Sequence, residues 1–237
     1  MNGASLLVFA RCAGFVSRAP GFSHPSVPHL VRVGLAILIA LAVSPGVHAH
    51  VTSAAGFVLA VAVEFLLGAA IGQAASLLYD GAYAGGRLLD DYVGVRAIAP
   101  SVAIVAPSGF GRVWSIAFTG AYFLLGGYRA ALVGFADGFT RFAPGSIPDA
   151  HAVGAFAASL ASTIVLVACA VAAPSMAMAF TVQVALAALS RAVPRFSSFS
   201  LSFPLVFAVV LVASALAIPL LASRAGAPVM LAPWSGK

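Results

Sequence analysis

Apolar runs of roughly 20 residues recur along this chain, and all but the first, which is weak, are long enough to cross the hydrocarbon core of a lipid bilayer as an α-helix. Six candidate segments lie at residues 4–19, 27–45, 54–79, 113–136, 153–189 and 199–222. In the whole chain 62% of the residues are hydrophobic and 8% are charged, against about 45–50% and about 25% in soluble domains. No polar stretch is long enough for a soluble domain. The sequence therefore predicts an all-α, polytopic integral membrane protein in which residues 1–237 form a single membrane domain built of helical hairpins.

The charges of the chain are few and scattered. A net charge of +6 arises from 11 Arg and one Lys against six acidic residues, and the basic residues stand singly rather than in runs. This pattern argues against nucleic acid as a partner. Scattered arginines beside apolar runs are typical of loops at the cytoplasmic face of a membrane and of contacts with anionic lipid. We therefore expect membrane lipids among the partners.

Two places depart from simple spanning helices. Residues 80–112 hold six charged side chains together with several Gly and Pro residues. This stretch is too apolar for a disordered linker and too broken for a helix, so it is interpreted as an interruption. The fifth segment is too long for one straight helix, and Pro174 near its middle is expected to kink or break it.

Glu64 stands in the middle of the third segment, where a carboxylate is costly unless it is paired or neutralised. Ala60, Glu64, Gly68 and Gly72 follow one another at a spacing of four residues, so they form one face of small side chains on a helix. One interpretation is a seam where another helix packs closely and Glu64 is hydrogen-bonded. The other is a carboxylate that couples proton movement to transport.

Arg129 and Asp137 are two further charges at membrane depth. Arg129 follows a pair of glycines in the fourth segment, and Asp137 lies eight residues beyond it. On a continuous helix they share a face about two turns apart, which is too far for a direct pair. Each is then expected to meet another segment, and the alternative for Arg129 is that its long side chain reaches the membrane interface.

No constellation of residues indicates catalysis. The chain lacks the short motifs of common nucleophilic, metal-dependent and nucleotide-dependent enzymes. His48 and His50 could touch one metal, but without a third ligand nearby a solvated loop is favoured. Cys12 and Cys169 lie in apolar segments without a partner motif and are interpreted as packing residues. We expect no enzyme activity, no cofactor and no metal.

The carboxyl half contains a specific spacing of Pro, Arg and Phe. Pro174 precedes Pro194 by 20 residues, and Pro204 follows Pro194 by ten. Arg191 lies three residues before Pro194, and Phe199 and Phe203 lie five and nine residues after it. This pattern resembles the FliR/SctT family, the export-gate subunit of flagellar and injectisome type III secretion.

Other stretches are also similar to this family. They are the early Arg followed by Pro20, the Glu64, Gly68 and Gly72 face, the sequence YAGGRLLDDYVG at 83–94, and FLLGGYRAALVGF at 123–135. Two positions depart from the family pattern. Arg195 stands where the family usually has Gln, and Tyr128 stands where a His is common. The polar partners at these two places are therefore expected to differ, and the missing His and shorter length favour an injectisome.

The resemblance implies a single-copy subunit of a multi-subunit gate in the bacterial inner membrane. Its expected partners are FliP/SctR-like and FliQ/SctS-like gate subunits, the FlhB/SctU-like switch subunit, and the unfolded proteins that are exported. In that family much of the apolar helix surface packs against partner subunits, so protein rather than lipid would surround the stray charges.

The resemblance also assigns two functional segments. The fifth and sixth segments would form a helical hairpin whose turn is residues 190–204, with the cationic side chains of Arg191 and Arg195 at its tip. Residues 94–112 match the family's loop that plugs the central pore. Small and chain-breaking residues there suit a plug that must block ions and then yield. The residues assigned to this plug are Gly94, Arg96, Pro100, Pro107, Gly109 and Gly111.

These observations predict a component of a type III protein export gate that forms and seals the channel for unfolded substrates. A small secondary transporter that uses Glu64 and Asp137 for ion coupling is the alternative. Such transporters often carry internal repeats, and no convincing repeat relates residues 27–112 to 113–222. A lipid-modifying intramembrane enzyme would need a reactive constellation that the sequence lacks.

Overall fold

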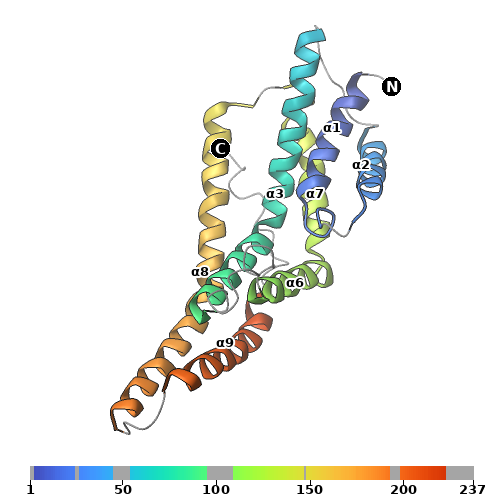
Figure 1. The fold of residues 1–237 in the computed structure, drawn as a ribbon. Helices are drawn as coiled ribbons and strands as arrows, with labels where there is room; N and C mark the ends of the chain where they lie inside the picture. The colour runs from blue at the N-terminus through green and yellow to red at the C-terminus, as the bar shows by residue number, and fades with distance from the viewer. Residues whose placement is uncertain are drawn as a thin grey trace. The chain divides into compact units, whose positions relative to one another are not determined.

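The computed structural model describes residues 3–24, 27–44, 54–94, 109–146, 148–192 and 198–222, and these residues form helices and short connections without a strand (Figure 1). The helices are α1 (Gly3–Arg18), α2 (His29–Val43), α3 (Ala54–Val93), α6 (Gly109–Leu124), α7 (Gly127–Arg141), α8 (Ala150–Ala192) and α9 (Ser198–Ala222). The predicted all-α fold is confirmed. The predicted division into six segments is not.

The fourth predicted segment, 113–136, consists of two helices. α6 ends at Leu124 and α7 begins at Gly127, with Gly126 between them at φ 77°. This left-handed conformation is open to glycine and strained for other residues, so it ends one helix and starts the next within an apolar run. The predicted segment 113–136 is therefore broken at Gly126, whereas Arg129 and Asp137 do lie on one continuous helix, α7.

Helix α3 continues past the interruption that the sequence predicted at residue 80 and ends only at Val93. The glycines in this part of α3 provide close packing rather than a break. A Cβ atom at Gly81 would lie 2.6 Å from the Cβ of Val167, and one at Gly85 would lie 2.7 Å from the carbonyl oxygen of Ala168. The prediction of an irregular stretch over residues 80–93 was therefore wrong.

Helix α8 passes through Pro174 without a break. Of the two effects expected from this proline, a kink or a break, the break does not occur. Proline lacks the N–H group that would bond the carbonyl of Ala170 one turn earlier. The helix nevertheless runs for 43 residues, from Ala150 to Ala192.

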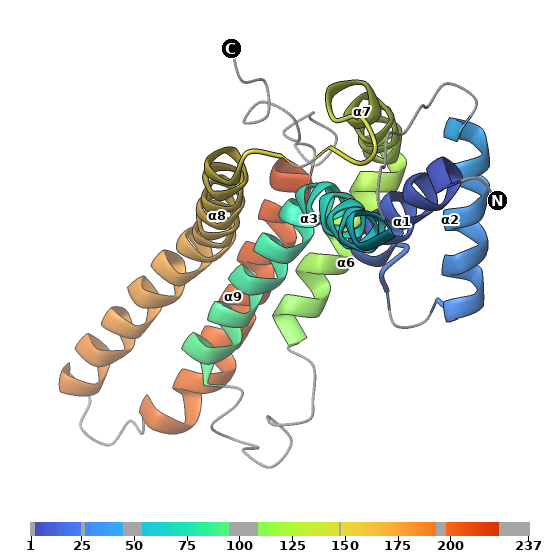
Figure 2. The ribbon, with the colours of Figure 1, turned by 90° about the horizontal axis from the view of Figure 1, so that it is seen from above.

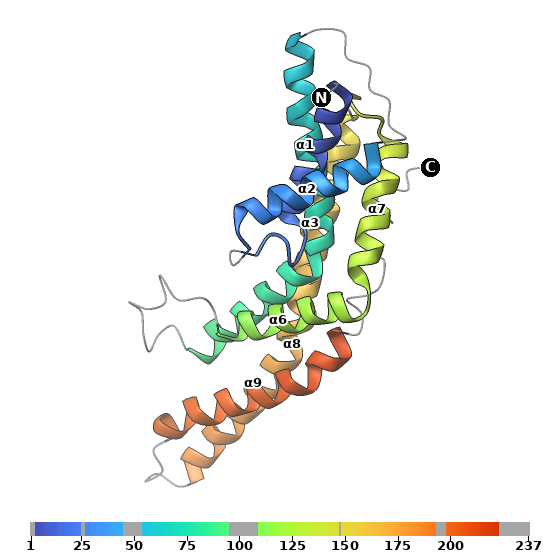
Figure 3. The ribbon, with the colours of Figure 1, turned by 90° about the vertical axis from the view of Figure 1, so that its right-hand side faces the viewer.

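The described chain divides into two compact units. The first contains α1, α2, α3 up to Leu77, α7, and α8 up to Ala161. Within it α1 lies between α3 and α2, as the views in Figures 1 and 2 agree, and Figure 3 shows α2 crossing α1 and α3. Phe15 of α1 stacks on Phe135 of α7 with ring centroids 4.4 Å apart. The core of this unit is therefore built around α1.

The second unit contains α3 from Leu78, α6, α8 from Ser162, and α9. Its core gathers apolar side chains from all four helices, among them Leu89, Trp114, Val171 and Val210, which are fully buried. The indole N–H of Trp114 donates to the hydroxyl of Ser214 across 3.3 Å, which joins α6 to α9. This unit is held mainly by apolar packing with a few internal hydrogen bonds.

Three of the described helices, α3, α8 and α9, are long and apolar enough to cross a membrane by length and composition, and α6 with α7 is a fourth candidate if the broken pair acts as one span. α2 is apolar, but its 15 residues give a length of about 22 Å, below the hydrocarbon thickness of about 30 Å.

Candidate functional site

The small-residue face of α3 packs directly on α1. A Cβ atom at Gly72 would lie 2.5 Å from the carbonyl oxygen of Phe15, and a Cβ at Gly68 would collide with the carbonyl of Arg11. The contact is reciprocal, because a Cβ at Gly14 of α1 would collide with the carbonyl of Phe65. No side chain larger than hydrogen fits at these three positions, so the two backbones touch.

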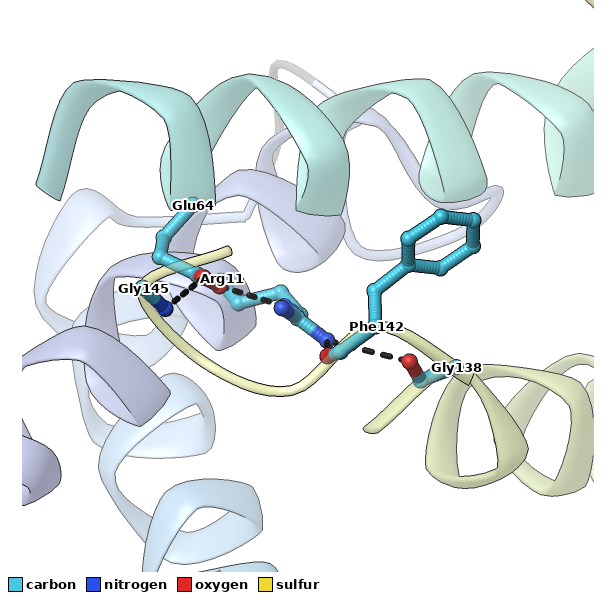
Figure 4. Close-up of polar contacts among 5 residues, drawn as sticks. All are labelled: Arg11, Glu64, Gly138, Phe142 and Gly145. Atoms are coloured by element: carbon cyan, nitrogen blue, oxygen red, sulfur yellow. Dashed lines mark hydrogen bonds and ion pairs between the residues drawn. The ribbon is translucent and has the colours of Figure 1, made fainter. Parts of the chain in front are cut away.

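Glu64 lies on this face and is fully buried, as is Arg11 of α1. Figure 4 shows the two side chains meeting, with the Nε–H of Arg11 donating to Oε2 of Glu64 across 2.5 Å. The second carboxylate oxygen, Oε1, accepts a hydrogen bond of 2.9 Å from the backbone N–H of Gly145. Both oxygens of Glu64 therefore have partners within the chain.

The guanidinium of Arg11 also binds the end of α7. Its Nη1 donates to the carbonyl oxygens of Gly138 at 3.1 Å and of Phe142 at 2.9 Å, and its Cζ lies 4.4 Å from the centre of the Phe139 ring. The last carbonyls of a helix have no donor within the helix and carry partial negative charge. Arg11 donates to the carbonyl of Phe142 and gives the carbonyl of Gly138 a second donor, beside the backbone N–H of Phe142 at 3.0 Å. Glu64 neutralises the charge of Arg11.

This Arg11–Glu64 cluster joins α1, α3, α7 and the connection after α7 within the first unit. Removing one member of a buried ion pair leaves an uncompensated charge, which costs about 3–5 kcal/mol. The arrangement can hold three helices in a fixed register. Among its polar atoms only Nη2 of Arg11 is buried without a hydrogen-bond partner in the described part of the chain.

Sequence reasoning singled out Glu64, Gly68 and Gly72 but missed Arg11 as the partner. The signal was present in the sequence, because Arg11 is a charge inside an apolar helix with Gly14 three residues later. When two apolar helices carry opposite charges and each has a glycine nearby, the pattern indicates that the helices cross at close range and that the two charges form an ion pair. Gly145 gives no such signal, since it contributes only its backbone N–H.

Arg129 and Asp137 are both exposed on the surface of α7. The structure does not bring either residue to Glu64, whose oxygens contact Arg11 and Gly145. Their expected contact with another segment stays a prediction.

Some of the residues predicted to form the plug lie in the described part of the chain. Gly94 follows α3 directly at φ 82°, and Gly109 and Gly111 belong to the first turn of α6. The backbone N–H of Gly94 donates to the carbonyl of Asp90 across 3.2 Å, which ends α3. Arg96, Pro100 and Pro107 lie outside the described residues.

The residues of the predicted hairpin turn lie at the ends of α8 and α9. Arg191 is exposed in the last turn of α8, and Pro204 lies within the first two turns of α9. Phe203 is exposed beside Pro204 and stacks on Phe207, while Phe199 belongs to the first turn of α9. Pro194 and Arg195 lie outside the described residues.

No group of three or more His, Cys, Asp and Glu side chains in the described residues could hold a metal ion. Cys12 is buried and Cys169 is exposed, and both are free thiols. His48 and His50 lie outside the described part of the chain.

The fold and the cluster define an all-α membrane protein whose helices are stapled by a buried ion pair. Residues 3–229 match the model of the bacterial export proteins, family 1, and the chain belongs to this family. It is similar to the flagellar biosynthetic protein FliR of Escherichia coli (strain K12), with 26% identity over 219 residues that cover 90% of this chain and 83% of the relative. The chain is thus a component of bacterial protein export and a multi-pass protein of the inner membrane.

Proposed function

We propose that this chain forms and seals part of the channel through which a type III export gate moves unfolded proteins across the inner membrane of a bacterium. Membership of the export family and the likeness to a flagellar biosynthetic protein support the proposal. In this function the chain acts by position rather than by catalysis, and the energy for export comes from other components. Removing the chain from cells should abolish secretion of the flagellar or injectisome substrates, and secretion at the normal rate would contradict the proposal.

The length of the apolar helices carries this proposal. α3 and α8 contain 40 and 43 residues, so they are about 60 and 65 Å long, roughly twice the thickness of the hydrocarbon core. Large apolar side chains are nevertheless exposed along α8 from Val153 to Leu189. Lipid can cover only about half of such a helix, and we infer that partner proteins cover the rest. FliP/SctR-like, FliQ/SctS-like and FlhB/SctU-like subunits are the proposed partners.

We further propose that residues 94–112 plug the channel at rest. Their small side chains, glycines and prolines support this role, because the segment must exclude ions and then give way to a substrate. Deleting residues 97–110 should make the assembled gate leak small ions, as measured by membrane conductance. An unchanged conductance in gates that assemble at the normal level would remove the plug assignment.

The contacts of Glu64 argue against the alternative of a small secondary transporter. An ion-coupling carboxylate must exchange its ligand during transport, whereas both oxygens of Glu64 are engaged by Arg11 and Gly145. Asp137, the second residue of that alternative, is exposed on α7. The two carboxylates therefore share no site in the chain.

A further inference from the structure

A second buried acid, Asp90, lies where α3 ends and α6 begins. Asp90 belongs to the last turn of α3 and is 2% exposed. Its Oδ1 accepts a hydrogen bond of 3.1 Å from the backbone N–H of Phe110, the second residue of α6. The first N–H groups of a helix have no partner within that helix, and a negative charge is favourable there. Asp90 therefore caps α6 from a different helix.

Backbone contact reinforces this cap. A Cβ atom at Gly86 of α3 would lie 2.5 Å from both the Cα and the amide nitrogen of Gly111 in α6. A Cβ at Gly109 would come within 3.5 Å of the Asp90 carboxylate. The first turn of α6 thus rests on α3 with no intervening side chain.

The other side of this turn is attached to α9. The rings of Phe110 and Phe207 have centroids 5.5 Å apart, and Trp114, one turn along α6, donates to Ser214 of α9. α9 therefore holds α6 through rings and one neutral hydrogen bond, whereas α3 holds it through a charged cap. Of these contacts, the cap is the one that joins α6 to α3 through a side chain and can be altered without changing core volume greatly.

We propose that Asp90 is the positioning residue of the seal. Gly94, where the chain leaves α3, and Gly109, where it enters α6, bound the segment to which the plug is assigned, and Asp90 ties these two points together. Loss of the cap frees the start of α6 to move away from α3, and the seal loosens. This inference rests on the proposed function.

The test measures ion conductance of the assembled gate, normalised to the amount of assembled complex. Asp90→Leu removes the acceptor at similar volume and should raise the leak about fivefold, the factor for loss of one capping hydrogen bond. Asp90→Asn keeps an oxygen at the same reach and should restore the seal, because Asn caps helices about as well as Asp. Asp91→Leu is the matched control, since Asp91 is exposed on the same turn, and it should not leak.

Each outcome of this experiment either supports or contradicts the role of Asp90. If Asp90→Leu gates do not assemble, Asp90→Ser is the substitute variant. The serine side chain is one bond shorter than that of Asp90, so its hydroxyl does not reach the backbone N–H of Phe110. Leu and Asn both keep the branched shape of Asp, and only Asn keeps the acceptor, so a tight Asn gate beside a leaky Leu gate assigns the leak to the lost hydrogen bond. A tight Asp90→Leu or Asp90→Ser gate beside a leaky deletion of residues 97–107, which keeps the cap donor Phe110, overturns the role of Asp90, and so does equal leak in the Asp91→Leu control. A tight deletion variant instead overturns the plug itself.

Discussion

The Arg11–Glu64 cluster in the first unit and the Asp90 junction in the second hold helices at the same close range with different chemistry. In both places glycines bring two backbones into contact. The first unit adds an ion pair whose two members also bind three backbone groups. The second adds one carboxylate at a helix N-terminus. We therefore expect the ion pair to hold the helices of the first unit more firmly than the single cap holds α6 against α3 in the second unit.

The largest effect is expected from breaking the ion pair on one side. Arg11→Leu leaves Glu64 charged and buried, and should lower stability by about 3–5 kcal/mol. The amount of folded chain in the membrane and its melting in detergent with co-expressed partners measure the loss. The double variant Arg11→Leu with Glu64→Leu should recover part of it, whereas Arg129→Leu on exposed α7 should change little. Equal melting of Arg11→Leu and the native chain would show that the pair contributes nothing.

A somewhat smaller effect is expected from separating the backbones. Gly68→Ala and Gly86→Ala each force two helices apart and should cost about 1–3 kcal/mol. Gly120→Ala is the matched control, because a Cβ there meets nothing within 4 Å in the chain, and it should stabilise α6 by about 0.5–1 kcal/mol. If all three variants melt alike, the glycine contacts do not hold the helices.

Glu64→Gln should cost about 3 kcal/mol, the low end of the range for an unpaired buried charge, because the isosteric amide keeps one hydrogen bond. The amide oxygen can still accept from Arg11 or Gly145, but the charge of Arg11 loses its compensation. Export per assembled gate should stay at the native rate, because the proposed role of Glu64 is packing. Loss of export at an unchanged level of gate would instead favour proton coupling.

The smallest effect is expected in the second unit from Ser214→Ala. This change removes the acceptor for the Trp114 indole and should cost about 1 kcal/mol. Ser115→Ala serves as the control, since its hydroxyl donates to the carbonyl of Arg112 in the preceding turn of its own helix. A larger loss for Ser115→Ala than for Ser214→Ala would contradict the importance of the α6 to α9 bond.

The sequence was most informative about single helices and least about pairs of helices. The spacing of Glu64, Gly68 and Gly72 defined a packing face, but one helix's period does not say which helix it meets, so Arg11 was missed. Gly85 and Gly86 were interpreted as part of an interruption, because a glycine that packs against a neighbour looks the same in sequence as one that ends a helix. Gly126 shows the converse, since it ends a helix inside an uninterrupted apolar run.

The central claim is that partner subunits cover the apolar helix surface that exceeds the bilayer. Photo-reactive side chains at exposed positions of α8 in the native gate, from Val153 through Leu166 and Met178 to Leu189, test it directly. We expect cross-links to partner subunits from positions spread over more than about 20 residues, the length that a bilayer can cover. Cross-links to lipid alone along the whole of α8 would contradict the account.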